Sequence, residues 1–286
     1  MEPLFEILVS AVLLSSMYVL AAAGFALVLS IMNILNFAHG AIYMVGGFLC
    51  YEFSVGYGLN QWLALALSAA SMALFGLFLE RFLFRRFYGD FFSSVIVSIA
   101  VIFVLQTTIN LTVAVNVRAL PTFAPGMLHL GSVTVSMERL VTAAIGVALL
   151  AAMVVFVRVS RTGQQMLAVA QDAEGAALQG IRIHRLAAIA MAAGCAMAAI
   201  AGSFMGAVFD LNSTMGDLIL VKVMQVVILS GIGSLGGILI GGLVIGSVDS
   251  ILPLFTTPAI TQAVGVAIVI ALLLVKPQGL FGREMG

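Results

Sequence analysis

The spacing of the charged residues is the feature that most constrains what this chain can fold into. Each charge-free gap is long enough for an apolar helix of about 20 residues that crosses a bilayer, and the first gap could hold two. Apolar and polar residues do not alternate strictly, which argues against a transmembrane β-barrel. We therefore predict an all-α, polytopic bundle of transmembrane helices. The gaps separate Glu6 from Glu52, Glu52 from Glu80, Asp90 from Arg118, Arg139 from Arg158, Arg185 from Asp210, Lys222 from Asp249, and Asp249 from Lys276.

Composition agrees with a membrane protein and excludes some partners. Of the 286 residues, 63% are hydrophobic and only 8% are charged, against roughly a quarter charged in an ordinary soluble domain. The net charge is zero and the longest basic run is the pair Arg85-Arg86, so we expect no nucleic-acid partner. Cys50 and Cys195 lie in apolar stretches, where packing is a better interpretation than a disulfide or a metal site. We expect no metal and no cofactor.

The apolar stretches predict about eight spans within one transmembrane domain that covers residues 1–286. The first residues, Met1–Glu6, are acidic, unlike the basic start of a secretory signal, so we expect the first span to be retained. The spans are expected at residues 7–32, 40–55, 61–80, 91–115, 138–157, 187–208, 219–252 (interrupted) and 259–275.

The basic residues predict the orientation of these spans. Short loops on the cytoplasmic side of a membrane carry the excess of Lys and Arg. One side of the predicted bundle has Arg81, Arg85, Arg86, Arg158, Arg161, Arg182, Arg185, Lys276 and Arg283, and the other has only Arg118, Arg139 and Lys222. We therefore expect the C-terminal tail to be cytoplasmic, and the N-terminus and the loop Asn116–Met137 to face outward.

Two segments interrupt the apolar pattern and are predicted to be broken or re-entrant. Asn33–Gly40 brings two amides and an imidazole into a charge-free run, and Gly231–Gly237 is rich in glycine. Broken helices in the two halves of a transporter are pointers to its substrate path, because backbone at membrane depth must line a cavity or be buried in protein. The alternative is that small and polar residues serve helix packing. We favour packing for Gly236, Gly237, Gly241 and Gly242.

For the polar side chains we favour a role in the path, since polar groups are costly in a bilayer. The ends of the half-helices at the two breaks could bind an amino acid zwitterion, and further amide and hydroxyl side chains could line the path. The candidate path residues are Asn33, Asn36, His39, Gly40, Gln106, Asn110, Gln225, Ser230 and Ser234.

The most substantial polar segment on the predicted cytoplasmic side is the loop of residues 158–186. Thr162 and Gln165 form a capping-box pattern, and Gly180 is placed to end the helix that follows. Small and apolar residues recur on one flank: Met166, Leu167, Ala170, Ala173, Ala177 and Leu178. Such a face suits a groove in a partner protein. The alternative, a helix that lies flat on lipid, usually carries larger apolar residues and more Lys and Arg.

Four stretches, in order along the whole chain, carry a resemblance to a known family. They are Asn36–Gly40, the loop from Arg161-Thr162-Gly163 through Ala170-Gln171-Asp172 to Gly180-Ile181, Gly231–Gly237, and the ending Lys276–Arg283. The chain closely resembles the membrane permease subunits of branched-chain amino acid ABC importers, LivH type. Two differences are the absence of a later Leu-Pro in the loop and Lys276 where Arg is expected.

The resemblance implies a bacterial inner-membrane subunit, set in the lipid bilayer, with several protein partners. These are a second, related permease subunit, two cytoplasmic ABC ATPases and a periplasmic solute-binding protein. It also implies that the polar loop transmits ATP hydrolysis to the permease. The residues expected to couple to the ATPases are Arg161, Thr162, Gly163, Ala170, Asp172, Ala173, Glu174, Ala177 and Gly180.

We predict a non-catalytic subunit, because no Gly-x-x-x-x-Gly-Lys-Ser/Thr loop occurs and neither lysine follows a glycine. An ion-coupled secondary transporter is the rival in another class, although only His39 lies inside a predicted span. A hydrolase built on Ser234 and His39 lacks the Gly-x-Ser-x-Gly pattern, since position 232 is Ile. Branched-chain amino acids are the expected substrate; urea, short amides and aromatic acids remain open.

Overall fold

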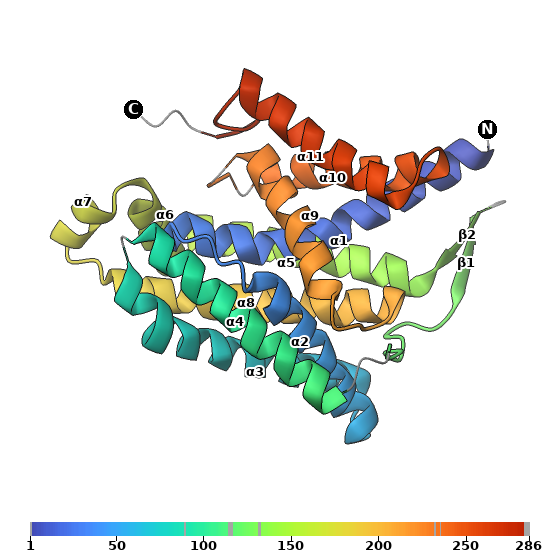
Figure 1. Cartoon of the computed structure of the whole chain (residues 1–286), viewed down its shortest axis with the longest axis horizontal. Coiled ribbons are helices and arrows are strands. Elements are labelled where there is room, and N and C mark those ends of the chain that lie inside the picture. The colour runs from blue at the N-terminus through green and yellow to red at the C-terminus, as the bar shows by residue number, and fades with distance from the viewer. Residues whose placement is uncertain are drawn as a thin grey trace.

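The computed structural model describes residues 2–88, 90–113, 117–130, 133–231, 233–234 and 236–282. Most of these residues are helical, which confirms the all-α, polytopic bundle (Figure 1). The elements are α1 (Glu2–Met32), α2 (His39–Tyr51), η1 (Glu52–Gly56), α3 (Gln61–Phe78), η2 (Leu79–Leu83), η3 (Phe84–Phe87), α4 (Phe91–Val113), β1 (Met127–Leu130), β2 (Val133–Ser136), α5 (Met137–Val159), α6 (Arg161–Gln171), α7 (Ala173–Leu178), α8 (Ile183–Phe209), α9 (Met215–Ser230), α10 (Gly237–Ile251), η4 (Leu252–Leu254) and α11 (Pro258–Val275).

Within the described residues, seven helical segments are long and apolar enough to cross a membrane. They contain α1, α3, α4, α5, α8, α10 and α11. The predicted span at 40–55 is formed by the shorter α2 with η1, and the predicted interruption of 219–252 separates α9 from α10. The architecture agrees with about eight spans.

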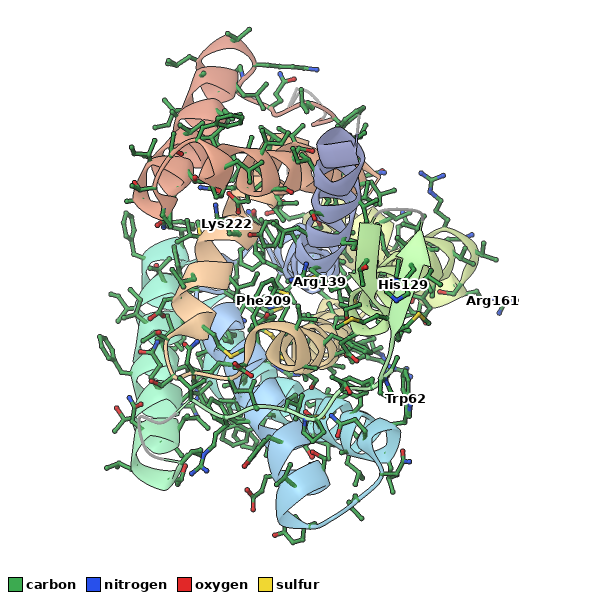
Figure 2. All side chains as sticks on the ribbon, turned by 90° about the vertical axis from the view of Figure 1, so that its right-hand side faces the viewer. Trp62, His129, Arg139, Arg161, Phe209 and Lys222 are labelled. Atoms are coloured by element: carbon green, nitrogen blue, oxygen red, sulfur yellow. The ribbon has the colours of Figure 1, made fainter. Side chains whose placement is uncertain are left out.

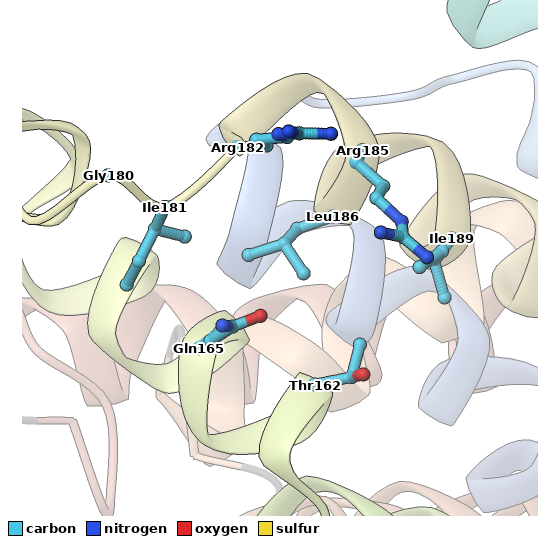
Figure 3. A pocket seen from close by; sticks show the side chains of 8 residues that line it. All are labelled: Thr162, Gln165, Gly180, Ile181, Arg182, Arg185, Leu186 and Ile189. Atoms are coloured by element: carbon cyan, nitrogen blue, oxygen red, sulfur yellow. The ribbon is translucent and has the colours of Figure 1, made fainter.

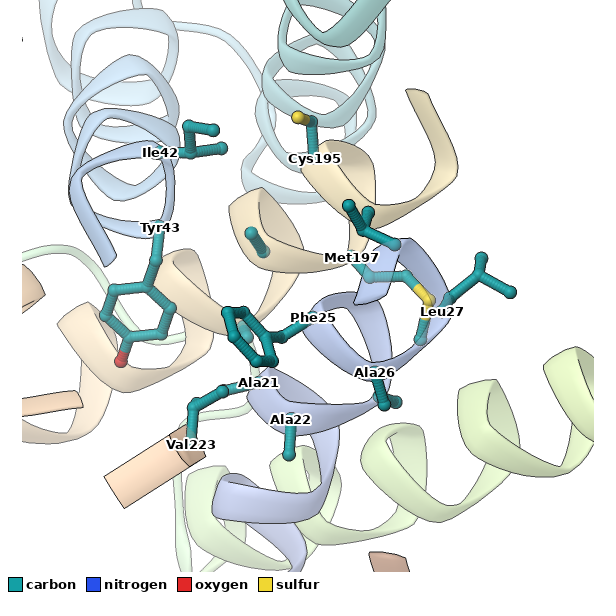
Figure 4. Close-up of a cluster of buried hydrophobic side chains, with 14 of the residues drawn as sticks. Ala21, Ala22, Phe25, Ala26, Leu27, Ile42, Tyr43, Cys195, Met197 and Val223 are labelled. Carbon is teal, nitrogen blue, oxygen red and sulfur yellow. The ribbon is translucent and has the colours of Figure 1, made fainter. Parts of the chain in front are cut away.

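Helix α1 forms the centre of the bundle, and small residues let its neighbours approach closely. It packs against α8, α10 and α5, and most of its residues from Ala11 to Ile31 are buried. A Cβ atom on Gly24 would lie 2.8 Å from the carbonyl oxygen of Gly194 in α8. Without a hydrophobic drive between helices in lipid, such close contacts supply much of the association energy. Figure 4 shows the ring of Phe25 of α1 pointing toward Tyr43 and Val223, with Met197 on the side of Leu27.

The helices α4 and α11 are peripheral. Only 22% of the residues in the span of α4 and 17% in that of α11 are buried. Large apolar side chains such as Phe103, Leu111 and Leu274 are exposed on them. In a membrane these faces meet lipid or another membrane subunit. In the view of Figure 2, side chains project outward around the edge of the bundle.

The two ends of the bundle differ. The hairpin β1–β2 lies at one end beside the N-terminus, whereas α6, α7 and the described end of the chain lie at the opposite one (Figure 1). The hairpin is antiparallel and pairs Met127 with Ser136. The sequence predicted only a loop between Asn116 and Met137, and Asn116 itself lies outside the described residues.

Candidate coupling surface and translocation path

The polar loop begins with a capped helix, but the cap is not the predicted one. Ser160 adopts extended backbone (φ −76°, ψ 147°) and its Oγ accepts the amide of Gly163 at 2.9 Å. Helix α6 therefore begins at Arg161, and the capping box assigned to Thr162 and Gln165 is wrong, because Thr162 already lies inside the first turn. A side chain on Gly163 would collide with the backbone of Phe156 and Val157 in the preceding helix, α5.

The loop holds two short helices where the sequence predicted one. Asp172 interrupts them with extended backbone (φ −152°, ψ 101°), and its Oδ1 accepts the amide of Gly175 at 2.9 Å as the N-cap of α7. Asp competes with helix by bonding nearby backbone, which explains the break. Gly180 ends α7 at φ +80°, as predicted, in a region that favours glycine.

The two faces of α6 and α7 have different environments. Gly163, Met166, Val169 and Ala176 are buried against the bundle. Met166 was expected on the docking flank, but it is 1% exposed and belongs to the core. The other side is exposed at Ala170, Ala173, Ala177 and Leu178, and also at Arg161, Asp172 and Glu174. Leu178 is 87% exposed, so this apolar surface has no covering element among the described residues.

A cavity of about 250 Å³ separates α6 from the start of α8 (Figure 3). Thr162 and Gln165 lie on one side of it, and Arg182 and Arg185 lie on the other. The polar loop is therefore not packed solidly against α8.

The first break is a re-entrant segment. Nε2 of His39 lies 3.2 Å from the carbonyl oxygen of Ala21, which precedes Met32, the last residue of α1, by 11 residues. That separation is about 16 Å of helix, and six extended residues can cover about 20 Å. After α1 ends, residues 33–38 therefore run back alongside α1 toward its N-terminus. As a result, α2 begins well inside the bundle.

Local chemistry holds this segment in place. Asn33 follows α1 with φ +50° and donates its amide to the carbonyl of Leu29 at 3.0 Å. Asparagine tolerates this conformation better than most residues. Oδ1 of Asn36 accepts the amide of Ala38 at 3.1 Å, and Asn36 is 1% exposed. The side chain of Asn33, by contrast, is exposed.

The start of α2 meets the start of α9. A Cβ atom on Gly40 would collide with the carbonyl oxygen of Gly216, so two helix N-termini lie in backbone contact. The next residue, Asp217, accepts a hydrogen bond of 2.8 Å from Nε2 of Gln106 in α4. Asn110 is exposed one turn further along α4. Gly40 and Gln106, which are distant in sequence, are thereby gathered around the first turn of α9.

The remaining predicted path residues lie elsewhere. Gln225 is 4% exposed, it faces Gly265 of α11, and neither its Oε1 nor its Nε2 has a partner among the described residues. The Oγ of Ser230 lies 2.6 and 2.9 Å from the carbonyl oxygens of Val226 and Gly237. Ser234 Oγ accepts the amide of Gly237 at 3.2 Å.

The C-terminal segment closes the second break. The amides of Leu280 and Phe281 donate to the carbonyls of Leu229 and Ser230 at 2.9 and 3.0 Å. These contacts satisfy carbonyls at the end of α9 that lack partners within the helix. Ile232 and Leu235, part of the predicted Gly231–Gly237 motif, lie outside the described residues.

Two buried charge clusters were missed by sequence reasoning. Nζ of Lys222 in α9 lies 2.7 Å from Oδ1 of Asp249 in α10, and the hydroxyl of Tyr18 donates to Oδ2 at 2.6 Å. The side chain of Lys222, labelled in Figure 2, thus connects α9 to α10. The sequence did contain a signal for this cluster, because Lys222 and Asp249 are each an isolated charge at the edge of a long apolar stretch. Their pairing needs the fold of α9 onto α10.

The second cluster lies where α3 ends. Glu80 is fully buried in η2 and accepts two hydrogen bonds from Arg85 at 3.1 and 2.9 Å. Tyr88 donates to the same carboxylate at 2.8 Å. Burial, together with this carboxylate, raises the pKa of Tyr88 above its usual 10, so the hydroxyl remains a donor near neutral pH. Among the described residues, no group of three or more His, Cys, Asp or Glu could hold a metal ion.

The sequence of this chain is similar to one family of known proteins over most of its length. Residues 7–274 match the model of the branched-chain amino acid transport system / permease component family. LivH, the high-affinity branched-chain amino acid transport system permease protein, is 30% identical in Salmonella typhimurium and in Escherichia coli K12, with 95% of this chain and 93% of each relative covered. BraD of Pseudomonas aeruginosa, also a high-affinity branched-chain amino acid transport system permease protein, is 28% identical over 96% of this chain and 95% of the relative.

The solved structure of PsaBC from Streptococcus pneumoniae in complex with Fab covers 94% of this chain and 90% of its own, with 13% identity and a TM-score of 0.48. The match to the family model and the similarity to LivH cover almost the whole chain. The chain therefore belongs to the family of branched-chain amino acid transport system permease components.

Proposed function

We propose that this chain is a membrane-spanning, non-catalytic permease subunit of an ATP-driven importer, and that it forms part of the path for branched-chain amino acids. The observation that carries the proposal is the family match over residues 7–274. The names of its relatives, LivH and BraD, support the substrate class. The chain itself offers no nucleotide-binding loop of the Walker type, so energy must come from partner subunits.

The exposed side of α6 and α7 is the surface we assign to the ATPases. It presents small apolar side chains, Ala170, Ala173 and Ala177, on helices that are capped and anchored by buried residues. A short, well-anchored helix with a small apolar face can insert into a groove. Two cytoplasmic ATPases, a second related permease subunit and an external solute-binding protein complete the proposed assembly.

We assign the path to the region where α2 and α9 begin. Gly40, Gln106 and Asp217 gather there, and the exposed Asn110 continues the polar edge along α4. Helix N-termini favour a carboxylate, and a carboxylate such as Asp217 favours an ammonium group. Both ends of an amino acid zwitterion thus have a complementary group. Ser230 and Ser234 bond within the fold, so their contribution is to the shape of the second break.

The substrate class is tested by transport into proteoliposomes that contain the co-purified complex. We expect ATP-dependent uptake of leucine, isoleucine and valine, and little uptake of urea, short amides or aromatic acids. Selective uptake of urea or an amide instead would keep the permease role and overturn the substrate.

The same assay separates the rival transport class. Uptake that follows an imposed proton or sodium gradient without ATP would favour an ion-coupled transporter. The pairing of Lys222 with Asp249 speaks against that alternative, because the charge of this buried carboxylate is compensated by a lysine and a tyrosine donates a hydrogen bond to it.

A further inference from the structure

A basic groove of about 680 Å³ lies between the end of α3 and the beginning of α8. Arg81 and Arg85 come from η2 and η3, and Arg182 and Arg185 come from the start of α8. No Asp or Glu is among the described residues that line it. Apolar side chains, including Ile183 and Ala188, form part of its wall.

Most of this positive charge is uncompensated. Glu80 forms an ion pair with Arg85 at 2.9 Å. Arg81, Arg182 and Arg185 form no ion pair with a described carboxylate, and all three are exposed. Three guanidinium groups from two segments that are about 100 residues apart therefore converge on one groove.

The groove lies at the depth of lipid headgroups. The span that ends with η3, Gln61–Phe87, has 27 residues, or about 40 Å of helix, whereas the hydrocarbon core is about 30 Å thick. The span Ile183–Phe209 has the same length. The terminal turns of both spans therefore reach into the headgroup layer. Exposed aromatic residues accompany Arg81 on α3 and η2, with Phe78 49% and Phe82 53% exposed.

We propose that this groove binds the phosphate group of an anionic phospholipid, with the acyl chains along Phe78 and Phe82. Guanidinium groups match phosphate oxygens in paired hydrogen bonds, and basic pockets between helices on the cytoplasmic side suit anionic headgroups. The apolar wall and adjacent aromatic surface favour a lipid over an acidic protein segment. Ala177 of α7 also lines the groove, so a bound lipid touches the proposed coupling surface.

The test is native mass spectrometry of the purified full-length chain, titrated with phosphatidylglycerol, phosphatidylcholine or inorganic phosphate. We expect selective binding of phosphatidylglycerol. Substitution of Arg81, Arg182 and Arg185 by Gln should weaken that binding by about fivefold per arginine. Lys at the same positions should restore part of it, since charge is kept but paired bonding is lost. Arg86→Gln, in the same turn but outside the groove, is the matched control.

Four results would overturn the proposal. Equal binding of the two lipids, or equal weakening by R86Q and by each groove variant, would reduce the groove to general surface charge. Competition by inorganic phosphate at equal concentration would remove the role of the acyl chains. Normal lipid binding by the triple Gln variant, together with loss of the ATPases when that variant is purified as the complex, would assign the groove to an acidic protein segment.

Discussion

At the scale of single residues, the molecule contains charges where an apolar bundle would have none. Lys222 and Asp249 lie inside helices and are largely buried, with side chains 14% and 8% exposed. Such a pair contributes little net stability relative to apolar residues, yet removing one partner leaves the other buried and unpaired. Its stability effect should therefore depend strongly on whether one or both residues are changed.

We expect K222M or D249N alone to destabilise the protein by about 3 to 5 kcal/mol, and the double variant by clearly less than the sum. Thermal unfolding of the purified chain in detergent measures this, with R86Q as an exposed control. If the single variants unfold at the same temperature as R86Q, the pair is solvated and contributes little to stability.

His39 offers a cleaner test of the path than Asn36. Asn36→Leu leaves the buried amide of Ala38 without its acceptor, which costs about 1 to 3 kcal/mol. The only hydrogen bond of the His39 side chain among the described residues joins Nε2 to the carbonyl of Ala21, which already accepts a bond within α1, so His39→Leu should spare assembly. We expect H39L to lower transport in proteoliposomes with the complex intact. F25L, at the edge of the imidazole ring, is the packing control, and equal loss in both variants would favour packing.

At the scale of elements, glycine decides how closely helices pack. The contact of α2 with α8 brings Gly202 so close to the carbonyl of Tyr43 that a Cβ atom would collide with it. Gly236, in contrast, has open space around its Cβ position and ordinary negative φ. The packing role predicted for Gly236 is therefore wrong, whereas a Cβ atom on Gly241 or Gly242 would collide with Ser230 or Val19.

G202A should lower the stability of the bundle by about 1 to 3 kcal/mol, whereas G236A should change it by no more than about 0.5 kcal/mol. Thermal unfolding of both variants under the same conditions compares them. An unchanged melting temperature for G202A would mean that α2 and α8 can separate at little cost.

Some of these elements could be predicted from the sequence and others could not. Charge-free stretches predicted the spans because a bilayer excludes charge, and Gly180 predicted the end of α7 because its left-handed backbone favours glycine. The break at Asp172 and the burial of Met166 were missed, since both depend on how the loop docks on the bundle. Two further features are tertiary contacts that no local sequence pattern encodes. They are the packing of the segment after Asn33 alongside α1 and the pairing of Lys222 with Asp249.

At the scale of the whole molecule, the two ends of the bundle should face different compartments. Arg161 begins α6, and Arg86 follows Arg85, which shares a groove with Ala177 of α7; Met127 lies on the hairpin at the other end. Cysteines at these exposed positions can be probed with a membrane-impermeant thiol reagent, because the native Cys50 and Cys195 are buried. We expect M127C to react from outside in intact cells, and R86C and R161C only after permeabilisation. Reaction of all three from one side would refute the orientation.

The central claim is that ATP hydrolysis by partner subunits drives this chain through the exposed side of α6 and α7. A partner shifts a conformational equilibrium only through contacts that differ between the states, and this surface presents Ala173 and Ala177 for such contacts. Arg at both positions would put bulk and charge into the proposed interface, while the exposed Gln164→Arg on α6 serves as the control.

The measurement is co-purification of the ATPases with the A173R/A177R variant, together with substrate-stimulated ATP hydrolysis of whatever complex is recovered. We expect the variant to insert into the membrane normally but to lose the ATPases, because unpaired charge at an interface costs several kcal/mol. The Gln164→Arg control should retain them. A double variant that keeps its ATPases and hydrolyses ATP with unchanged stimulation by substrate would contradict the coupling role of α6 and α7.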